Sequence, residues 1–307
     1  MRTFGRGNIL NKSRLFRRGI SFRSQTIALL IPYLLGALLL ILLPAGISFY
    51  IAFTQFNGID PPIFIGWQNF QLLSRDPLFW VAMINSSLFI MMAVPLRILG
   101  ALGLALFYSR PRRAVGFYRA AVYLPTVIPE MAFALIWLWI LNPLYGPLNA
   151  LLRTLSLPAP SWLVDPSWAP LAIVLVMFFQ LGEGFVILLA ALRHVPSEVY
   201  DAAHVDGANR WQVFESITLP FLTPWLVLLI VRDIALSFQI TFTPAYVMTR
   251  GGPYYSTFYV PLLMFETAFD GLRFGQAAAL MLIVFLLTVL LVLLVYFIFE
   301  GWGFDEG

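Results

Sequence analysis

The sequence has no cysteine among its 307 residues and only two histidines, His194 and His204. Without thiols the chain cannot form disulfides or thiolate metal sites, and two histidines are too few for a histidine-rich metal centre. Charge is also scarce, because Asp, Glu, Lys and Arg make up 11% of the residues, against about a quarter in a soluble domain. These shortages argue against a chain that folds in water.

Apolar residues are abundant instead. The hydrophobic set accounts for 60% of the chain, and the mean hydropathy is +0.85. A soluble globule of this length cannot bury that much apolar surface, so the composition predicts an integral membrane protein. The long apolar tracts favour helices, because barrel strands are only about 10 residues long and alternate in polarity.

Six apolar tracts are long enough to cross a membrane, since a spanning helix needs about 20 residues. They cover residues 27–53, 82–107, 121–141, 169–192, 222–246 and 276–299. The first is too long for a signal-peptide core and lacks a small-residue cleavage site, so we expect a retained span. The expected fold class is therefore an all-α membrane protein with six transmembrane helices. It comprises a basic tail over 1–26, a membrane domain over 27–299 and a short tail over 300–307.

Basic residues are concentrated on one side of these tracts. Thirteen precede the first tract or lie in the second and fourth connections, against four in the other three connections. The excess places both termini in the cytoplasm. We interpret the basic tail as an orientation signal on anionic membrane lipid rather than as a nucleic-acid arm.

The cytoplasmic connection over 193–221 carries the signals of a folded element. Ser197 is expected to cap a helix, with Glu198 and Asp201 in its first turn, where carboxylates suit the helix dipole. Gly207 permits a tight turn with positive φ. A second amphipathic helix is expected over 209–217.

The charge of this connection favours a protein partner over lipid. Its acids outnumber Arg210, which argues against contact with an anionic membrane surface. They are Glu198, Asp201, Asp206 and Glu215. Two short helices on a stiff frame suit docking into a groove of a partner protein.

The same connection resembles the EAA loop of permease subunits of ABC importers. Matching positions are Ala202, Ala203, Gly207, Ile217, Leu219 and Pro220, while Asp201 stands where the family usually has Glu. In that family the loop forms the coupling helices that sit in a cleft of the ATPase subunit. The candidate ATPase-coupling residues are these seven together with Glu198, Asp206 and Ala208.

The resemblance extends to carbohydrate permeases of the maltose and glycerol-3-phosphate type (MalF/UgpA-like). It rests on residues 65–90, on parts of 124–152 and on the Gly-Gly-Pro loop over 246–257, where Arg250 replaces a glycine. It implies a type I ABC importer (MetI-like) permease fold in the cell membrane, carrying a sugar or sugar-like solute. It also implies an extracytoplasmic solute-binding protein, a second permease subunit of the MalG/UgpE type and two copies of an ABC ATPase subunit.

The chain lacks an ATP site of its own. A P-loop needs Gly-x4-Gly-Lys-Ser/Thr, but the only lysine, Lys12, has Arg6 and Asn11 at the two glycine positions. We therefore expect no enzyme activity and no cofactor in this chain, with ATP and Mg bound by the partner ATPase.

Five charged residues fall within or near the apolar tracts: Arg97, Glu130, Glu183, Arg232 and Asp233. A charge at mid-membrane costs about 2.5–3.5 kcal/mol, so such groups usually face protein or water. One interpretation is structural ion pairing, with different partners for Arg232 and Asp233 because they diverge by about 100° on a helix. The other is a sugar path, lined by Gln180, Glu183, Asp233, Ser237 and Gln239.

Two other classes of protein compete with a permease subunit. An ion-coupled secondary transporter predicts midplane acids, which are present, and internal repeats, which are not evident. It also leaves the docking loop unexplained. A membrane-embedded enzyme needs a nucleophile with a base, or a metal set, and the spacing of residues supports neither.

Overall fold

The computed structural model describes residues 22–109 and 113–299. Most of the expected basic tail over 1–26 and all of the tail over 300–307 lie outside the described residues. The chain divides into two compact units, Met1–Tyr50 and Ile51–Gly307, and each is described by itself.

The first unit is helical throughout its described part. It consists of α1 (Phe22–Ala37), the π-helical turn η1 (Leu38–Leu42) and α2 (Leu43–Ile51). Residues Leu29–Ile51 form a candidate span with mean hydropathy 2.3, and none of its most apolar stretch is buried. The predicted span over 27–53 is thus present as a long helix that ends at Ile51, and most of its described side chains are exposed.

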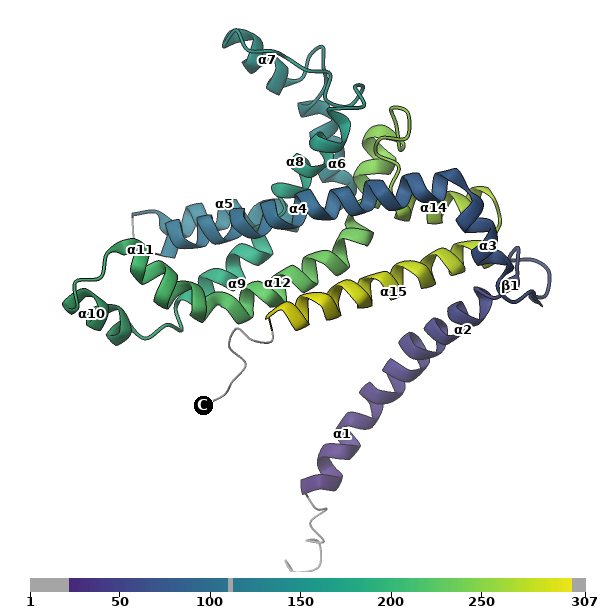
Figure 1. The fold of residues 1–307 in the computed structure, drawn as a ribbon, viewed down its shortest axis with the longest axis horizontal. Helices are drawn as coiled ribbons and strands as arrows, with labels where there is room; N and C mark the ends of the chain where they lie inside the picture. The colour runs from purple at the N-terminus through teal and green to yellow at the C-terminus, as the bar shows by residue number, and fades with distance from the viewer. Residues whose placement is uncertain (1–21, 110–112, 300–307) are drawn as a thin grey trace, which may run out of the picture. The chain divides into compact units, whose positions relative to one another are not determined.

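Three further helices of the second unit are long and apolar enough to cross a membrane. They are α4 (Pro77–Ser109), α15 (Phe274–Phe299) and a continuous helix over Arg210–Thr249. The last combines α11 (Arg210–Val213), η2 (Phe214–Thr218), α12 (Leu219–Ile240), α13 (Phe242–Pro244) and η3 (Ala245–Thr249). Figure 1 shows α12 between α4 and α15, against both of which it packs.

Two predicted spans are broken rather than straight. The tract over 121–141 forms α5 (Val115–Val127) and α6 (Glu130–Ile140), which meet at 103°. The cause is Pro129, because the residue before a proline is driven out of the helical region. Ile128 accordingly adopts an extended conformation, with φ −70° and ψ 130°.

The second broken tract, over 169–192, forms α8 (Ala169–Phe178) and α9 (Gly182–Leu192), which meet at 42°. In the break, the amides of Phe179, Gln180 and Leu181 donate to carbonyls three residues back, which makes a tighter turn than an α-helix. With each bent pair counted as one span, the described residues offer up to six crossings.

Helix α9 lies at the centre of the packing, in contact with α4, α5 and α12. Gly182 allows one of these contacts, because a Cβ there would lie 2.9 Å from the Cα of Tyr123 and from the carbonyl oxygen of Val122. Two apolar clusters form the core. One joins α4, α9, α12 and α15, and the other joins α4, α6, α8 and the segment around Tyr259.

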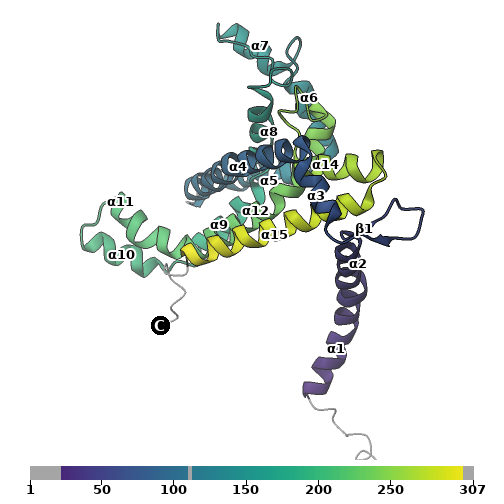
Figure 2. The ribbon, with the colours of Figure 1, turned by 45° about the vertical axis from the view of Figure 1, so that its right-hand side comes forward.

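Shorter elements connect the helices. The strands β1 (Thr54–Gln55) and β2 (Ile63–Phe64) pair antiparallel, with Thr54 opposite Phe64. The other short helices are α3 (Gln68–Arg75), α7 (Pro147–Thr154), α14 (Val260–Phe265) and the π-helical turn η4 (Glu266–Asp270). In Figures 1 and 2, α7 lies at the end of an arm that α6 and α8 form away from α15.

The connection over 193–221 contains one separate helix rather than two. Helix α10 (Ser197–Val205) begins with Pro196 in the capping position, so the predicted cap by Ser197 is wrong. The predicted helix over 209–217 is not separate either, because α11 continues through η2 into α12. The wider π-turn accommodates Pro220, whose ring and missing N–H would disrupt a regular α-helix at this point.

Candidate functional site

A polar cavity of about 420 Å³ lies where both helix breaks approach the middle of α4 and the end of α12. Its lining residues are Arg97, Thr126, Ile128, Glu130, Gln180, Glu183, Arg232, Leu236, Gln239 and Ile240. Irregular backbone at membrane depth is tolerated only where it is buried in protein or lines a cavity. The breaks and the cavity therefore explain one another.

Each break places a carboxylate in the first turn of the helix that follows it. Glu130 begins α6, and Glu183 is the second residue of α9. A negative charge there is stabilised by the helix dipole. Glu130 also accepts a hydrogen bond from the Thr243 hydroxyl at 3.0 Å. Both carboxylates are thus held on the cavity wall.

Ion pairs join the helices behind and beside this wall. Arg97 of α4 lies 3.5 Å from the carboxylate of Asp233 on α12, and both side chains are buried. Arg232 pairs with Glu183 of α9 and, at 3.1 Å, with Asp233. The expected separate partners are confirmed, but Arg232 and Asp233 also pair with each other. The long guanidinium side chain spans the angle between the two positions.

The structure places three of the five candidate path residues on the cavity wall: Gln180, Glu183 and Gln239. Asp233 and Ser237 lie behind it, 3% and 2% exposed. The Ser237 hydroxyl donates to the Asp233 carbonyl of its own helix.

Three charged residues on the wall were not among the predicted path residues. They are Arg97, Glu130 and Arg232. For Glu130 the sequence did contain a signal, because a proline directly before an acid in an apolar tract indicates that a helix begins at a polar site.

Helix α10 presents two different faces. Val199, Tyr200 and Ala203 are half-buried, whereas Glu198, Asp201 and Ala202 are exposed. Val205 is also on the exposed side, with 88% of its surface accessible. The outward face therefore combines two carboxylates with small and apolar side chains. We call Glu198, Asp201, Ala202 and Val205 the α10 outer face.

The turn after α10 is held by backbone and capping bonds. Gly207 has φ +75°, as predicted, and its amide donates to His204. The Ala208 amide donates to Ala203, and Asp206 ends the helix. Next, Asn209 and Gln212 form a reciprocal capping box at the start of α11, which gives α10 a stiff support.

The remaining coupling candidates lie on the helix that follows. Ile217 belongs to η2, and Leu219 and Pro220 begin α12. Ile217 and Leu219 are half-buried, and Pro220 is exposed. These three residues connect α10 to the long helix rather than forming its outer face.

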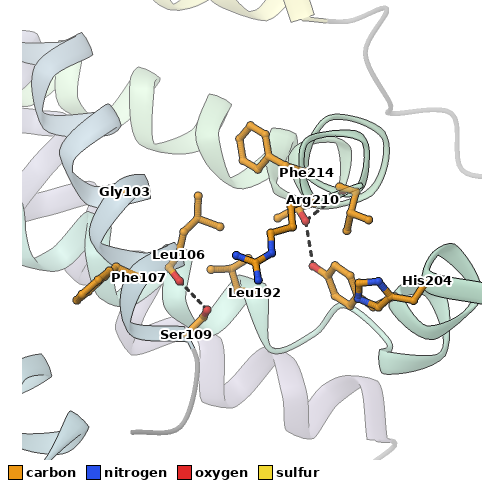
Figure 3. Close-up of a pocket in the computed structure, with 11 residues that line it drawn as sticks. Gly103, Leu106, Phe107, Ser109, Leu192, His204, Arg210 and Phe214 are labelled. Carbon is orange, nitrogen blue, oxygen red and sulfur yellow. Dashed lines mark hydrogen bonds between the residues drawn. The ribbon is translucent and has the colours of Figure 1, made fainter. Parts of the chain in front are cut away.

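A second cavity, of about 670 Å³, separates α10 from the end of α4. Figure 3 shows side chains of α4, including Leu106 and Ser109, across the cavity from His204 and Arg210. The Tyr200 hydroxyl lies 3.2 Å from the Thr218 hydroxyl and ties α10 to η2. The inner side of α10 is thus supported from the following helix, while its outer face stays open.

The loop that contains the Gly-Gly-Pro sequence is cross-braced. Arg250 adopts φ +49°, so the conformation that glycine favours is present with arginine in its place. The Thr249 and Thr257 hydroxyls lie 2.7 Å apart, and Asn85 of α4 donates to the carbonyl of Tyr255.

Burial raises the pKa of the Tyr259 hydroxyl. Nearby, burial and the charge of Asp270 raise the pKa of Glu266.

Comparison with known proteins shows the family to which the chain belongs. Residues 97–301 match the family model described as "Binding-protein-dependent transport system inner membrane component". The chain belongs to this family, which confirms the resemblance that the loop indicated. The matched region contains the polar cavity residues, α10 and the Gly-Gly-Pro loop.

Relatives cover nearly the whole chain. It is 31% identical to the probable ABC transporter permease protein YesP of Bacillus subtilis, over 97% of this chain and 96% of that one. It is 30% identical to the trehalose/maltose transport system permease protein MalF of Thermococcus litoralis, over 85% of this chain and 88% of that one.

A solved structure has the same fold. A chain of a bacterial alginate ABC transporter, crystallised with an alginate-bound periplasmic protein, superposes with a TM-score of 0.78 and 21% identity. The match covers 90% of this chain and 94% of that one. The protein is therefore a multi-pass permease subunit of an ABC importer in the cell membrane. Its membership of this family excludes the alternative of an ion-coupled secondary transporter.

Proposed function

We propose that this permease carries a sugar or sugar-like solute inward, and that the polar cavity is part of its path. The observation that carries the proposal is the convergence of both helix breaks on one polar cavity. Carboxylates and amides bind sugar hydroxyls well, because they accept, or both donate and accept, hydrogen bonds. Relatives named for trehalose/maltose, lactose and starch degradation products support a sugar as cargo.

In this proposal the path residues are Gln180, Glu183 and Gln239, with Glu130 added. Asp233 and Ser237 act behind the wall, where Asp233 holds Arg97 and Arg232 in place. The cavity volume lies within the range of about 300–1,000 Å³ for small-molecule sites.

The proposed topology has six crossings with both termini in the cytoplasm. The distribution of basic residues supports it. The loop over 193–221 then lies in the cytoplasm, and the Gly-Gly-Pro loop faces an extracytoplasmic solute-binding protein.

The α10 outer face is the proposed contact with the ATPase. Two copies of that subunit would bind ATP and Mg, one on this chain and one on a second permease subunit of the MalG/UgpE type. Closure of the ATPase pair would pull α10, and the continuous helix over Arg210–Thr249 would transmit the movement towards the polar cavity.

Replacement of Glu183 by alanine tests the path. We expect Glu183→Ala to lower uptake of the cognate sugar about tenfold or more, since a hydrogen bond to a charged group is worth about 1.5–3 kcal/mol. Assembly should stay intact, because Arg232 keeps Asp233 as a partner. The control is Glu266→Ala, which removes a half-buried carboxylate away from the cavity. Unchanged uptake in assembled Glu183→Ala importer would refute the path assignment.

A further inference from the structure

The charges around the polar cavity are unbalanced towards the negative. Of its described lining residues, the charged ones are Arg97, Glu130, Glu183 and Arg232, and Asp233 lies directly behind them. Three carboxylates thus accompany two guanidinium groups, which gives a formal net charge of −1 when all are ionised.

Both guanidinium groups form ion pairs with carboxylates of the bundle. Arg97 is 7% exposed, pairs with Asp233 and lies 3.5 Å from the Gln180 carbonyl oxygen. Its Nε and Nη1 atoms have no hydrogen-bond partner among the described residues, but both are buried. Arg232 bridges Glu183 and Asp233. A carboxylate, sulfonate or phosphate on the solute would therefore meet a buried Arg97 and an Arg232 whose charge is already shared by two carboxylates.

The two acids on the wall are more accessible. The Glu183 side chain is 48% exposed, and Glu130 is exposed with only the neutral Thr243 hydroxyl as its polar partner among the described contacts. An anionic solute would approach these carboxylates with like charge, which opposes binding. Uncharged hydroxyls would instead donate hydrogen bonds to them.

We propose that the polar cavity selects uncharged glycans or polyols and disfavours solutes that carry an anionic group. This inference rests on the proposed sugar-import function and narrows the class of its substrate. The residues that set the preference are Glu130 and Glu183, because they supply the accessible charge. Among them, Glu130 has no guanidinium partner in the described part of the chain, so its replacement disturbs the ion pairs least.

The test uses the complete importer, with its own binding protein and ATPase, reconstituted in lipid vesicles. The probes are matched pairs: a neutral disaccharide, with maltose, trehalose and lactose tried in turn, and the same disaccharide with one CH₂OH oxidised to a carboxylate. Uptake of each is measured for the parent importer and for Glu130→Gln. Because the binding protein is the same in both, its own selectivity cancels when the two neutral-to-acidic uptake ratios are compared.

We expect the parent to carry the neutral sugar about tenfold faster or more, since an anionic solute meets the like charge of the accessible Glu130 and Glu183 carboxylates. Glu130→Gln should lower the neutral-to-acidic ratio about threefold or more, and the control Glu266→Gln should leave it unchanged. Faster uptake of the acidic sugar by the parent, or an unchanged ratio in Glu130→Gln, would overturn the charge inference. If an assembled importer carries neither neutral nor acidic glycans, the proposed function itself fails and this inference fails with it.

Discussion

At the scale of single residues, Arg97 and Asp233 form a buried ion pair inside the helix bundle, in which each charge compensates the other. Removing one member of a buried pair leaves the other without compensation, which costs about 3–5 kcal/mol. The pair joins α4 to α12. Loss of one member therefore weakens the packing of these two helices against each other rather than the stability of one helix.

We predict that Asp233→Ala lowers the thermal stability of the purified importer far more than Ser237→Ala does. Ser237 is one turn further along α12 and equally buried, but its hydroxyl bonds only to its own helix in the described contacts. The measurement is the unfolding temperature in detergent. The double variant Arg97→Leu with Asp233→Leu should recover part of the loss. Equal losses of unfolding temperature in Asp233→Ala and Ser237→Ala would contradict this role of the ion pair.

The sequence predicted that the intramembrane charges would be paired or functional, but not how they would be arranged. Local sequence shows that Arg232 and Asp233 diverge on a helix. It does not show that Arg97 from α4 reaches Asp233, because that contact depends on how two distant helices pack. The same limit applies to Ser237, whose orientation follows from the rotation of α12.

At the scale of elements, the loop over 193–221 shows the closest link between sequence and structure. Gly207 was expected to permit a tight turn with positive φ, and its φ is +75°. A Cβ at this position would meet no other atom within 4 Å, so the requirement is conformational and not steric. The backbone conformation of Gly207 therefore sets the orientation of α10 relative to the helix that begins with α11.

We predict that Gly207→Val blocks transport and abolishes substrate-stimulated ATP hydrolysis, because a β-branched residue is strongly disfavoured at positive φ. A suitable control is Gly66→Val, since Gly66 has φ +61° and equally open surroundings but lies in the connection before α3. Both variants carry the same kind of backbone strain, so a general loss of stability would affect both. Normal stimulation of ATP hydrolysis in Gly207→Val would argue against a coupling role for the loop.

Helix breaks were the elements that sequence predicted least well. Apolar content showed where membrane tracts lie, but it did not show that two of them bend. Pro129 supplied a local signal for the first bend. The second depends on three tighter turns between α8 and α9 and on the close approach of α5 to Gly182, which only the packed structure reveals.

At the scale of the whole molecule, composition and a single loop are enough to predict the class of protein. Composition excludes a soluble enzyme, and the loop over 193–221 resembles a known coupling element. The family match confirms that assignment. The polar cavity could not be foreseen in the same way, because its walls come from α4, α5, α6, α9 and α12 and from the break before α9.

In the proposed mechanism a separate ATPase drives this permease through the α10 outer face. This contact is best tested by site-specific photo-crosslinking. Because the chain has no cysteine, an introduced cysteine is its one labelling site. Val205→Cys carries the photoreactive label, Ile59→Cys is the control, and the cysteine-free parent is the background. Ile59 is 82% exposed, similar to Val205, but lies between β1 and β2. Crosslinked products of the complete importer are identified by mass spectrometry.

We predict that labelled Val205→Cys crosslinks to a P-loop ATPase subunit and that labelled Ile59→Cys does not. Substrate and ATP should change the yield at Val205, because the coupling helix moves when the ATPase pair closes. An ATPase product from Ile59→Cys, or none from Val205→Cys in an importer shown to retain its ATPase, would contradict a coupling contact at the α10 outer face.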